Sequence, residues 1–85
     1  MGSLITDHVA RREFRSFVEI GDAIRLSEDA RRRALSLSER EWADWTRVLA
    51  DGPLPQHPEL PEMLQRLGSA SYSLAAAAEQ QGVAA

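Results

Sequence analysis

The chain has 85 residues, no cysteine and a net charge of −3, with 44% hydrophobic and 27% charged residues. These values exclude an intrinsically disordered chain, a disulfide framework and a thiolate metal site. No apolar run approaches the roughly 20 residues that span a bilayer, and no secretory signal is present at the start. We therefore expect one domain over residues 1–85, ordered from about 7 to 80, in a cytoplasmic protein without membrane contact.

The charges are distributed unevenly along the chain. Residues 1–50 carry nine arginines against nine acids, whereas residues 51–85 carry one arginine against four acids. Nucleic-acid-binding domains usually have a basic face, and these totals do not indicate one. All ten cations are arginines, which suit phosphate recognition, although complete replacement of lysine is also typical of a genomic base-composition bias.

Hydrophobic residues first recur at helical spacing near the N-terminus, which predicts a helix from Thr6 or Asp7 to about Arg25. Its expected buried stripe contains Val9, Phe14, Phe17, Val18, Gly21 and Ile24. Glycine weakens a helix by about 1 kcal/mol relative to alanine. Gly21 therefore predicts that another helix crosses closely at this point.

Two helix-start signals follow close together. Ser27 precedes two acids that stabilise a helix N-terminus, which predicts a short helix over Glu28–Leu35. Ser38 and Glu41 have the spacing of a capping box, which predicts a third helix directly after Ser38. The chain must therefore turn sharply within residues 36–38.

The third predicted helix carries both tryptophans on one side, together with other hydrophobic residues: Trp42, Trp45, Val48 and Leu49. Asp51-Gly52-Pro53 ends it, and the four prolines predict an extended surface loop up to Pro61. Pro61 suits the first turn of a fourth helix. The stripe expected on that helix is Leu60, Leu64, Leu67, Ser71, Leu74 and Ala78, flanked by Met63, Ala70 and Tyr72. Residues 80–85 are expected to fray.

The second and third predicted helices form a helix-turn-helix arrangement, because both are short and a three-residue turn joins them. We predict an all-α fold class: a compact four-helix domain in which the first and fourth helices pack behind the helix-turn-helix. This pattern is typical of DNA-binding domains, but helix bundles without a nucleic-acid function have similar connections.

Several segments between Phe14 and Gln80 match the pattern of one family. They are Phe17-Val18-Glu19-Ile20-Gly21-Asp22, Arg25-Leu26-Ser27-Glu28, Ala34-Leu35-Ser36-Leu37-Ser38, Trp45, Gly52-Pro53-Leu54 and Leu64-Gln65-Arg66-Leu67-Gly68. In these residues the chain resembles the N-terminal helix-turn-helix domain of Xre-type antitoxins, the MbcA/ParS/Xre group. The resemblance implies a bacterial transcriptional regulator that binds operator DNA as a homodimer.

The sequence departs from that family in two places. The family's toxin-binding domain would begin after Gln81, so direct neutralisation of a toxin is not expected of these residues. The expected reading helix also carries three acids against two arginines, which would bring like charges to the DNA phosphates. These residues are Glu39, Glu41 and Asp44, opposed by Arg40 and Arg47. The alternative is therefore a domain that keeps this fold but no longer binds DNA.

Five arginines are the candidate DNA contacts. Arg40 and Arg47 would act from the reading helix, whereas Arg31, Arg32 and Arg33 would contact the phosphate backbone. The alternatives are surface ion pairs: Arg40 with Asp44 one turn later, and the arginine run with the acids just before it.

A second set of residues predicts a homodimer interface. It consists of Tyr72, Leu74, Ala75 and Ala78, because small residues permit close approach of two helices. A frayed helix end is the alternative. Trp42 and Trp45 are expected in the core, whereas an exposed Trp42 would indicate a patch that binds a partner.

No cofactor, metal or catalytic site is expected. His8 and His57 lie in different segments without carboxylates at metal-ligand spacing, and no glycine-rich phosphate loop is present. We therefore do not expect an enzyme. The helix-turn-helix pattern and the resemblance to Xre-type antitoxins imply a DNA-binding transcriptional regulator. The alternative is a helical protein-interaction or dimerisation module that docks on a toxin or an enzyme and no longer binds DNA.

Overall fold

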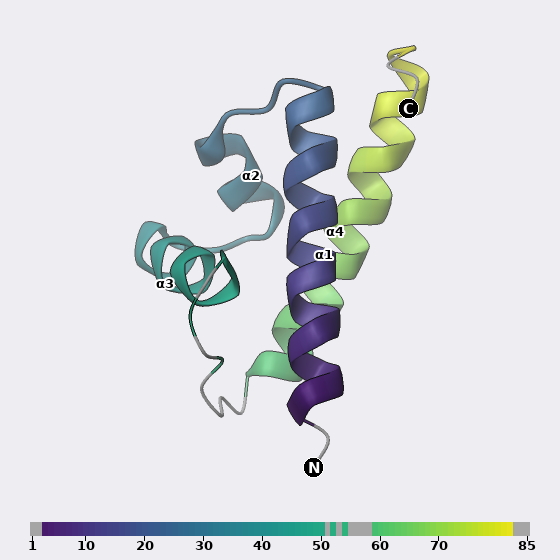
Figure 1. Ribbon diagram of the computed structural model, residues 1–85. Coiled ribbons are helices and arrows are strands. Elements are labelled where there is room, and N and C mark those ends of the chain that lie inside the picture. Colours follow the sequence, from purple (N-terminus) through teal and green to yellow (C-terminus); the bar gives the residue numbers. More distant parts are fainter. Residues whose placement is uncertain (1–2, 51, 53, 55–58, 83–85) are drawn as a thin grey trace.

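The computed structural model describes residues 3–50, 52, 54 and 59–82, which form four α-helices and no strand (Figure 1). The helices are α1 (Ser3–Ala23), α2 (Glu28–Ala34), α3 (Glu39–Ala50) and α4 (Leu60–Gln80). Helices α1 and α4 lie side by side and run in the same direction, and α2 and α3 pack against this pair, close to residues of both helices. The predicted all-α, four-helix fold is confirmed.

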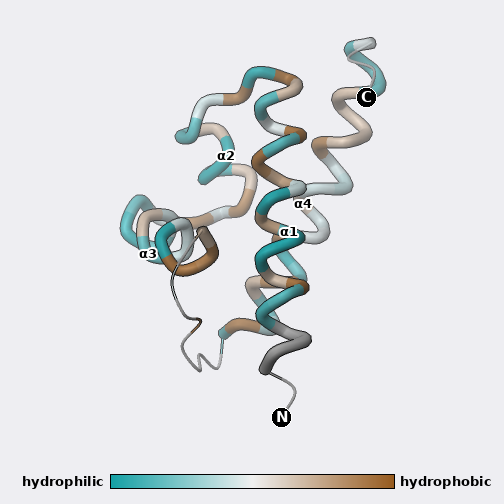
Figure 2. Tube along the Cα trace, viewed as in Figure 1, coloured by the Kyte–Doolittle hydropathy of each residue, from teal (hydrophilic) through white to brown (hydrophobic). Residues whose placement is uncertain are grey.

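The core lies where α1 meets the other helices. Phe17, Leu35 and Leu67 are the largest side chains that are fully buried, and they come from α1, the residue that ends α2, and α4. The indole of Trp42 packs against two rings of α1, with ring centroids 6.2 Å from Phe14 and 6.3 Å from Phe17. In Figure 2 hydrophobic and hydrophilic segments alternate along α1, as expected for a helix with one buried face.

Helix α1 is longer at its start and shorter at its end than predicted. It begins at Ser3, one turn before the predicted cap, and it ends at Ala23 rather than near Arg25. Arg25 has a left-handed backbone conformation (φ 59°), and the Leu26 N–H donates to the Gly21 carbonyl over 2.7 Å. This is the geometry of a Schellman motif, which ends a helix at the residue before the left-handed one.

The predicted turn between α2 and α3 is confirmed. Ser36 is left-handed (φ 58°), and the Leu37 N–H donates to the Arg32 carbonyl over 3.1 Å, so α2 also ends in a Schellman motif. The chain therefore reverses within the residues that the sequence indicated, and α3 is a separate helix.

Both predicted caps are present. Ser27 accepts a hydrogen bond from the Ala30 N–H over 3.2 Å at the start of α2. At the start of α3, the Ser38 N–H donates to Glu41 Oε1 over 3.1 Å and the Glu41 N–H donates to Ser38 Oγ over 3.2 Å. The Ser38 backbone N–H, and then its hydroxyl, lower the pKa of the Glu41 carboxyl. The carboxylate is therefore the form that holds this capping box.

Helix α4 buries one face against α1. Its buried residues are Leu60, Met63, Leu67, Ala70, Ser71, Leu74 and Ala78, while Leu64 is half-buried. The helix continues through Gln80, and Gly82 follows with a left-handed backbone (φ 74°). Residues 51, 53 and 55–58 of the predicted proline loop and residues 83–85 of the predicted frayed end lie outside the described residues. None of the described helices is both long enough and apolar enough to span a membrane.

Candidate nucleic-acid interface

Helix α2 is anchored to α1 by a buried arginine. The Arg31 side chain, only 10% exposed, forms an ion pair with Asp22 and lies over Gly21. A methyl group on Gly21 would stand 3.1 Å from Arg31 Cδ and closer still to Nε. The space beside Gly21 is filled by a side chain from α2 and not by the closely crossing helix that was predicted.

This placement corrects one predicted DNA contact. Arg31 was expected to grip phosphate, but its guanidinium is enclosed between α1 and α2. The prediction for Arg31 is wrong. Arg31 lies on the same face of α2 as Leu35, four residues later, and that face is buried. Arg31 therefore orients α2 and does not reach the surface.

A second arginine holds the C-terminal end of α3. Arg11 donates to the Leu49 carbonyl over 3.1 Å and also to the Gly52 carbonyl. The last carbonyls of a helix have no partner within the helix, so a cation from α1 satisfies them and opposes the negative end of the helix dipole. Sequence reasoning missed Arg11. The available signal was its position: Arg11 lies three residues before Phe14 and seven before Val18, on the helix face that was expected to be buried.

The outer face of α3 carries both arginines that were expected to read DNA. Arg40, Ala43, Asp44 and Arg47 are all exposed, and their spacing of three, four and seven residues places them on one face. Trp45 and Leu49 are buried on the opposite face. Arg47 lies 3.4 Å from Asp44, and the structure gives Arg40 no ion-pair partner among the described residues. We call these four residues the outer stripe; its net charge is +1.

Two of the three acids expected to meet the phosphates lie off this stripe. At about 100° per residue, Glu39 and Glu41 project to the two sides of Arg40. The Glu41 carboxylate is also bound to the Ser38 N–H. Glu39 lies beside a surface hollow of about 370 Å³, whose other lining includes Glu28 and Asp29. Of the acids on α3, only Asp44 belongs to the outer stripe.

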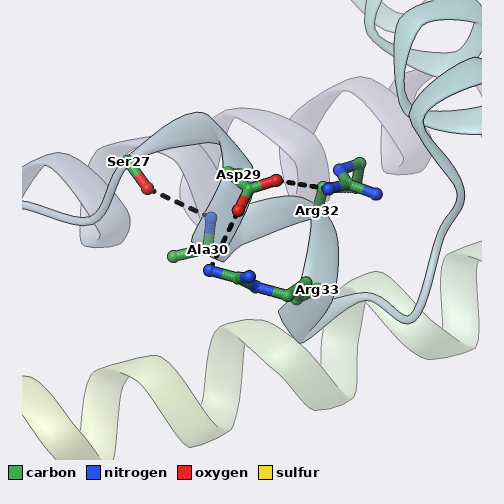
Figure 3. Close-up of polar contacts among 5 residues, drawn as sticks. All are labelled: Ser27, Asp29, Ala30, Arg32 and Arg33. Atoms are coloured by element: carbon green, nitrogen blue, oxygen red, sulfur yellow. Dashed lines mark hydrogen bonds and ion pairs between the residues drawn. The ribbon is translucent and has the colours of Figure 1, made fainter.

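The arginines of α2 share one carboxylate. Asp29 is hydrogen-bonded to Arg32 and lies 2.9 Å from Arg33 (Figure 3). The hydrogen bond from Arg32 is the main cause that lowers the pKa of Asp29. Desolvation opposes it, and the charges of Arg33 and Arg32 lower the pKa further. The Arg33 side chain is 69% exposed and that of Arg32 only 20% exposed. Arg33 is therefore the more accessible phosphate contact of the two.

The structure divides the predicted dimer set between two faces of α4. Leu74 and Ala78 are buried against the domain's own core, so their assignment to a dimer interface is wrong. They lie three and four residues from Ser71 and Leu74 respectively, on the stripe that faces α1. Tyr72 is 80% exposed, and Ala75 beside it is half-buried. Only these two remain candidates for contact with another molecule.

The tryptophans divide in a similar way. Trp45 is buried as predicted, and Trp42 is half-buried, with its indole against the rings of α1. Trp42 is therefore not a free binding patch. His8 is exposed and His57 lies outside the described residues; within the described ranges, no group of three or more His or acidic side chains converges as a metal site would require.

Comparison with protein-family models, curated proteins and solved structures finds no match to this chain.

Proposed function

We propose that the domain is a cytoplasmic transcriptional regulator of the Xre antitoxin type that binds duplex DNA through the outer stripe of α3. The observation that carries this proposal is the exposed Arg40, unpaired in the described structure, in the first turn of the second helix of a capped helix-turn-helix. The first turns of such a helix enter the major groove and contact base edges. Arginine is the side chain that most often makes these contacts.

The anchoring of the two helices supports this role. Arg31 fixes α2 against α1, and Arg11 fixes the end of α3, so the outer stripe is presented on a rigid support. The reading helix is thus held by Arg11 at its C-terminal end and by the anchored α2 at its N-terminal end. A helix held in this way loses less conformational entropy when it enters the groove. Arg33, with a smaller contribution from Arg32, lies on the neighbouring helix where a phosphate contact is expected.

Fluorescence anisotropy with a labelled duplex from upstream of the gene tests the proposal. The double variant Arg40→Ala/Arg47→Ala should bind the duplex at least tenfold more weakly than the parent protein. The control is Arg12→Ala/Arg15→Ala, which removes the same charge from the exposed side of α1. This control should bind nearly as well as the parent. Two or three phosphate contacts predict that affinity falls about tenfold to fortyfold between roughly 50 and 200 mM salt. Equal losses in both double variants would contradict the assignment of α3.

The same proposal includes a homodimer, as helix-turn-helix proteins bind two half-sites. The outer face of α4 supports it, because Tyr72 stands exposed among small residues, with Gly68 one turn before it and Ala76 one turn after. Light scattering after size exclusion should show a dimer that Tyr72→Asp dissociates. Ser73→Asp, which adds the same charge at the neighbouring exposed position, should leave the mass unchanged.

One observation favours a second function, that of a protein-interaction module. Asp29 and Asp44 already pair with three of the exposed or partly exposed arginines of α2 and α3, which leaves few free cations for phosphates. If the parent protein binds no duplex at low salt but still forms a Tyr72-dependent dimer, the interaction module is the correct function.

A further inference from the structure

The outer stripe of α3 contains a carboxylate that a phosphate-binding surface would not carry. Asp44 lies between Arg40 and Arg47 in the helical row, and its side chain is 59% exposed. Its contact with Arg47 spans 3.4 Å between two exposed side chains, and such a pair contributes little to stability. Both side chains are therefore free to change partner when another surface approaches.

The chemistry of a carboxylate restricts what Asp44 can contact in the major groove. It accepts hydrogen bonds and donates none, and the groove offers two donors, cytosine N4 and adenine N6. In an A·T pair the adenine amino group lies between two acceptors that repel a carboxylate, adenine N7 and thymine O4. In a C·G pair the cytosine amino group has an acceptor, guanine O6, on one side only. Asp44 is thus suited to cytosine.

Arg40 complements this choice. Its guanidinium offers a planar fork of donors, which matches the O6 and N7 acceptors of guanine. Positions 40 and 44 are separated by about 6 Å along a helix axis, which corresponds to one or two base-pair steps of duplex DNA. Between them Ala43 has only a methyl group, so the helix backbone can approach the bases closely.

We infer that Arg40 and Asp44 are specificity-determining residues, an inference that rests on the proposed DNA binding. Arg40 selects a guanine and Asp44 selects a cytosine one or two base-pair steps away in each half-site. Sequence discrimination then comes from the outer stripe, since Asp44 weakens rather than strengthens attraction to any phosphate.

Selection from a library of random duplexes, followed by anisotropy on the chosen sites, tests this inference. The parent should prefer its selected C·G pair over A·T at the Asp44 position by about 5- to 100-fold. Asp44→Asn should move that preference toward A·T, because an amide pairs with both N6 and N7 of adenine. Asp29→Asn makes the same charge change on α2 and should strengthen binding to all duplexes alike, because it frees Arg32 and Arg33.

A change in the DNA alone gives an independent measurement. Replacing the selected guanine with 7-deazaguanine removes the N7 acceptor and should weaken binding by the parent but not by Arg40→Ala. Equal affinity of the parent for C·G and A·T duplexes would overturn the inference while leaving the proposed DNA binding intact. An Asp44→Asn variant with the parent's preference would also overturn it. No binding of the parent to any duplex would overturn the proposed function itself.

Discussion

The two halves of the molecule share one apolar core but differ in the contacts that hold the ends of their helices. Helices α1 and α4 are long, lie parallel and pack through apolar side chains, with Phe17 and Leu67 completely enclosed. Helices α2 and α3 are shorter. Their segment also contributes Leu35, Leu37, Trp45 and Leu49 to the core. Polar contacts hold their ends in addition: Arg31 with Asp22, Arg11 with the Leu49 carbonyl, and the Ser38–Glu41 capping box.

This difference reflects the length of the helices. Isolated helices below about 12–15 residues are marginal in water, so a 7-residue helix such as α2 requires caps and tertiary contacts to persist. Polar contacts are directional, which suits a unit that must present a defined surface. Both units share the apolar core that supplies stability, and the α2–α3 unit gains its orientation in addition from individual hydrogen bonds and ion pairs.

The largest expected effect comes from a core residue of α4. Leu67→Ala should lower the free energy of unfolding by about 3 kcal/mol, because it leaves a cavity in a fully buried site. In a domain of this size that corresponds to a fall in Tm of about 15 °C by calorimetry. The exposed Gln65→Ala on the same helix is the control and should change Tm by no more than a few degrees. Similar losses in both variants would contradict the assignment of Leu67 to the core.

A double-mutant cycle examines how α2 is anchored. Gly21→Ala should destabilise the domain by about 1 kcal/mol in urea unfolding, because the new methyl displaces the Arg31 side chain. In an Arg31→Ala background the same substitution should stabilise it by up to about 1 kcal/mol, since alanine is the better helix former. A stabilising Gly21→Ala in both backgrounds would show that Arg31 does not occupy this space.

The capping box gives the next effect and a dependence on pH. Ser38→Ala should cost about 1 kcal/mol at neutral pH. Because folding lowers the pKa of Glu41, the unfolded chain binds the proton more readily and stability rises with pH. The contribution of the Glu41 charge is fully present above the ordinary value of 4.5 and is lost as the pH falls through the lowered pKa.

Glu41→Gln is the matched variant, because its amide oxygen can still accept from the Ser38 N–H but carries no charge. Urea unfolding should find it less stable than the parent at pH 7, with the difference disappearing at strongly acidic pH. A difference that stays constant over this range would contradict the role of the carboxylate.

The sequence predicted correctly those features that depend on contacts between residues close together along the chain. The caps at Ser27 and Ser38 were predictable, because each involves residues within three positions along the chain. The sharp turn followed from the two caps. The side chain of Arg31 was misplaced, because its burial depends on Gly21, which lies ten residues away on another helix.

The same limit explains the surfaces. The buried stripe of α4 was predicted largely correctly by its spacing, yet Leu74 and Ala78 were also assigned to a dimer. A stripe identifies the face that is covered and not the molecule that covers it. The outer stripe of α3 became visible only when exposure was known for Arg40, Asp44 and Arg47 together.

The smallest expected effect tests the backbone of the turn between the two halves of the helix-turn-helix. Ser36 is held in the left-handed region, which costs a residue with a Cβ about 1 kcal/mol and costs glycine almost nothing. Ser36→Gly should therefore raise the free energy of unfolding by about 0.5 kcal/mol, somewhat less than the strain relieved, because glycine also loosens the unfolded chain. Ser69→Gly, at an exposed position within α4, has the same chemistry without the strain and should lower stability by a similar amount. If Ser36→Gly raises the free energy of unfolding in urea and Ser69→Gly lowers it, a left-handed residue must lie between α2 and α3. If both substitutions lower the free energy of unfolding, Ser36 has an ordinary helical conformation. The break between α2 and α3, on which the reading helix depends, would then be absent.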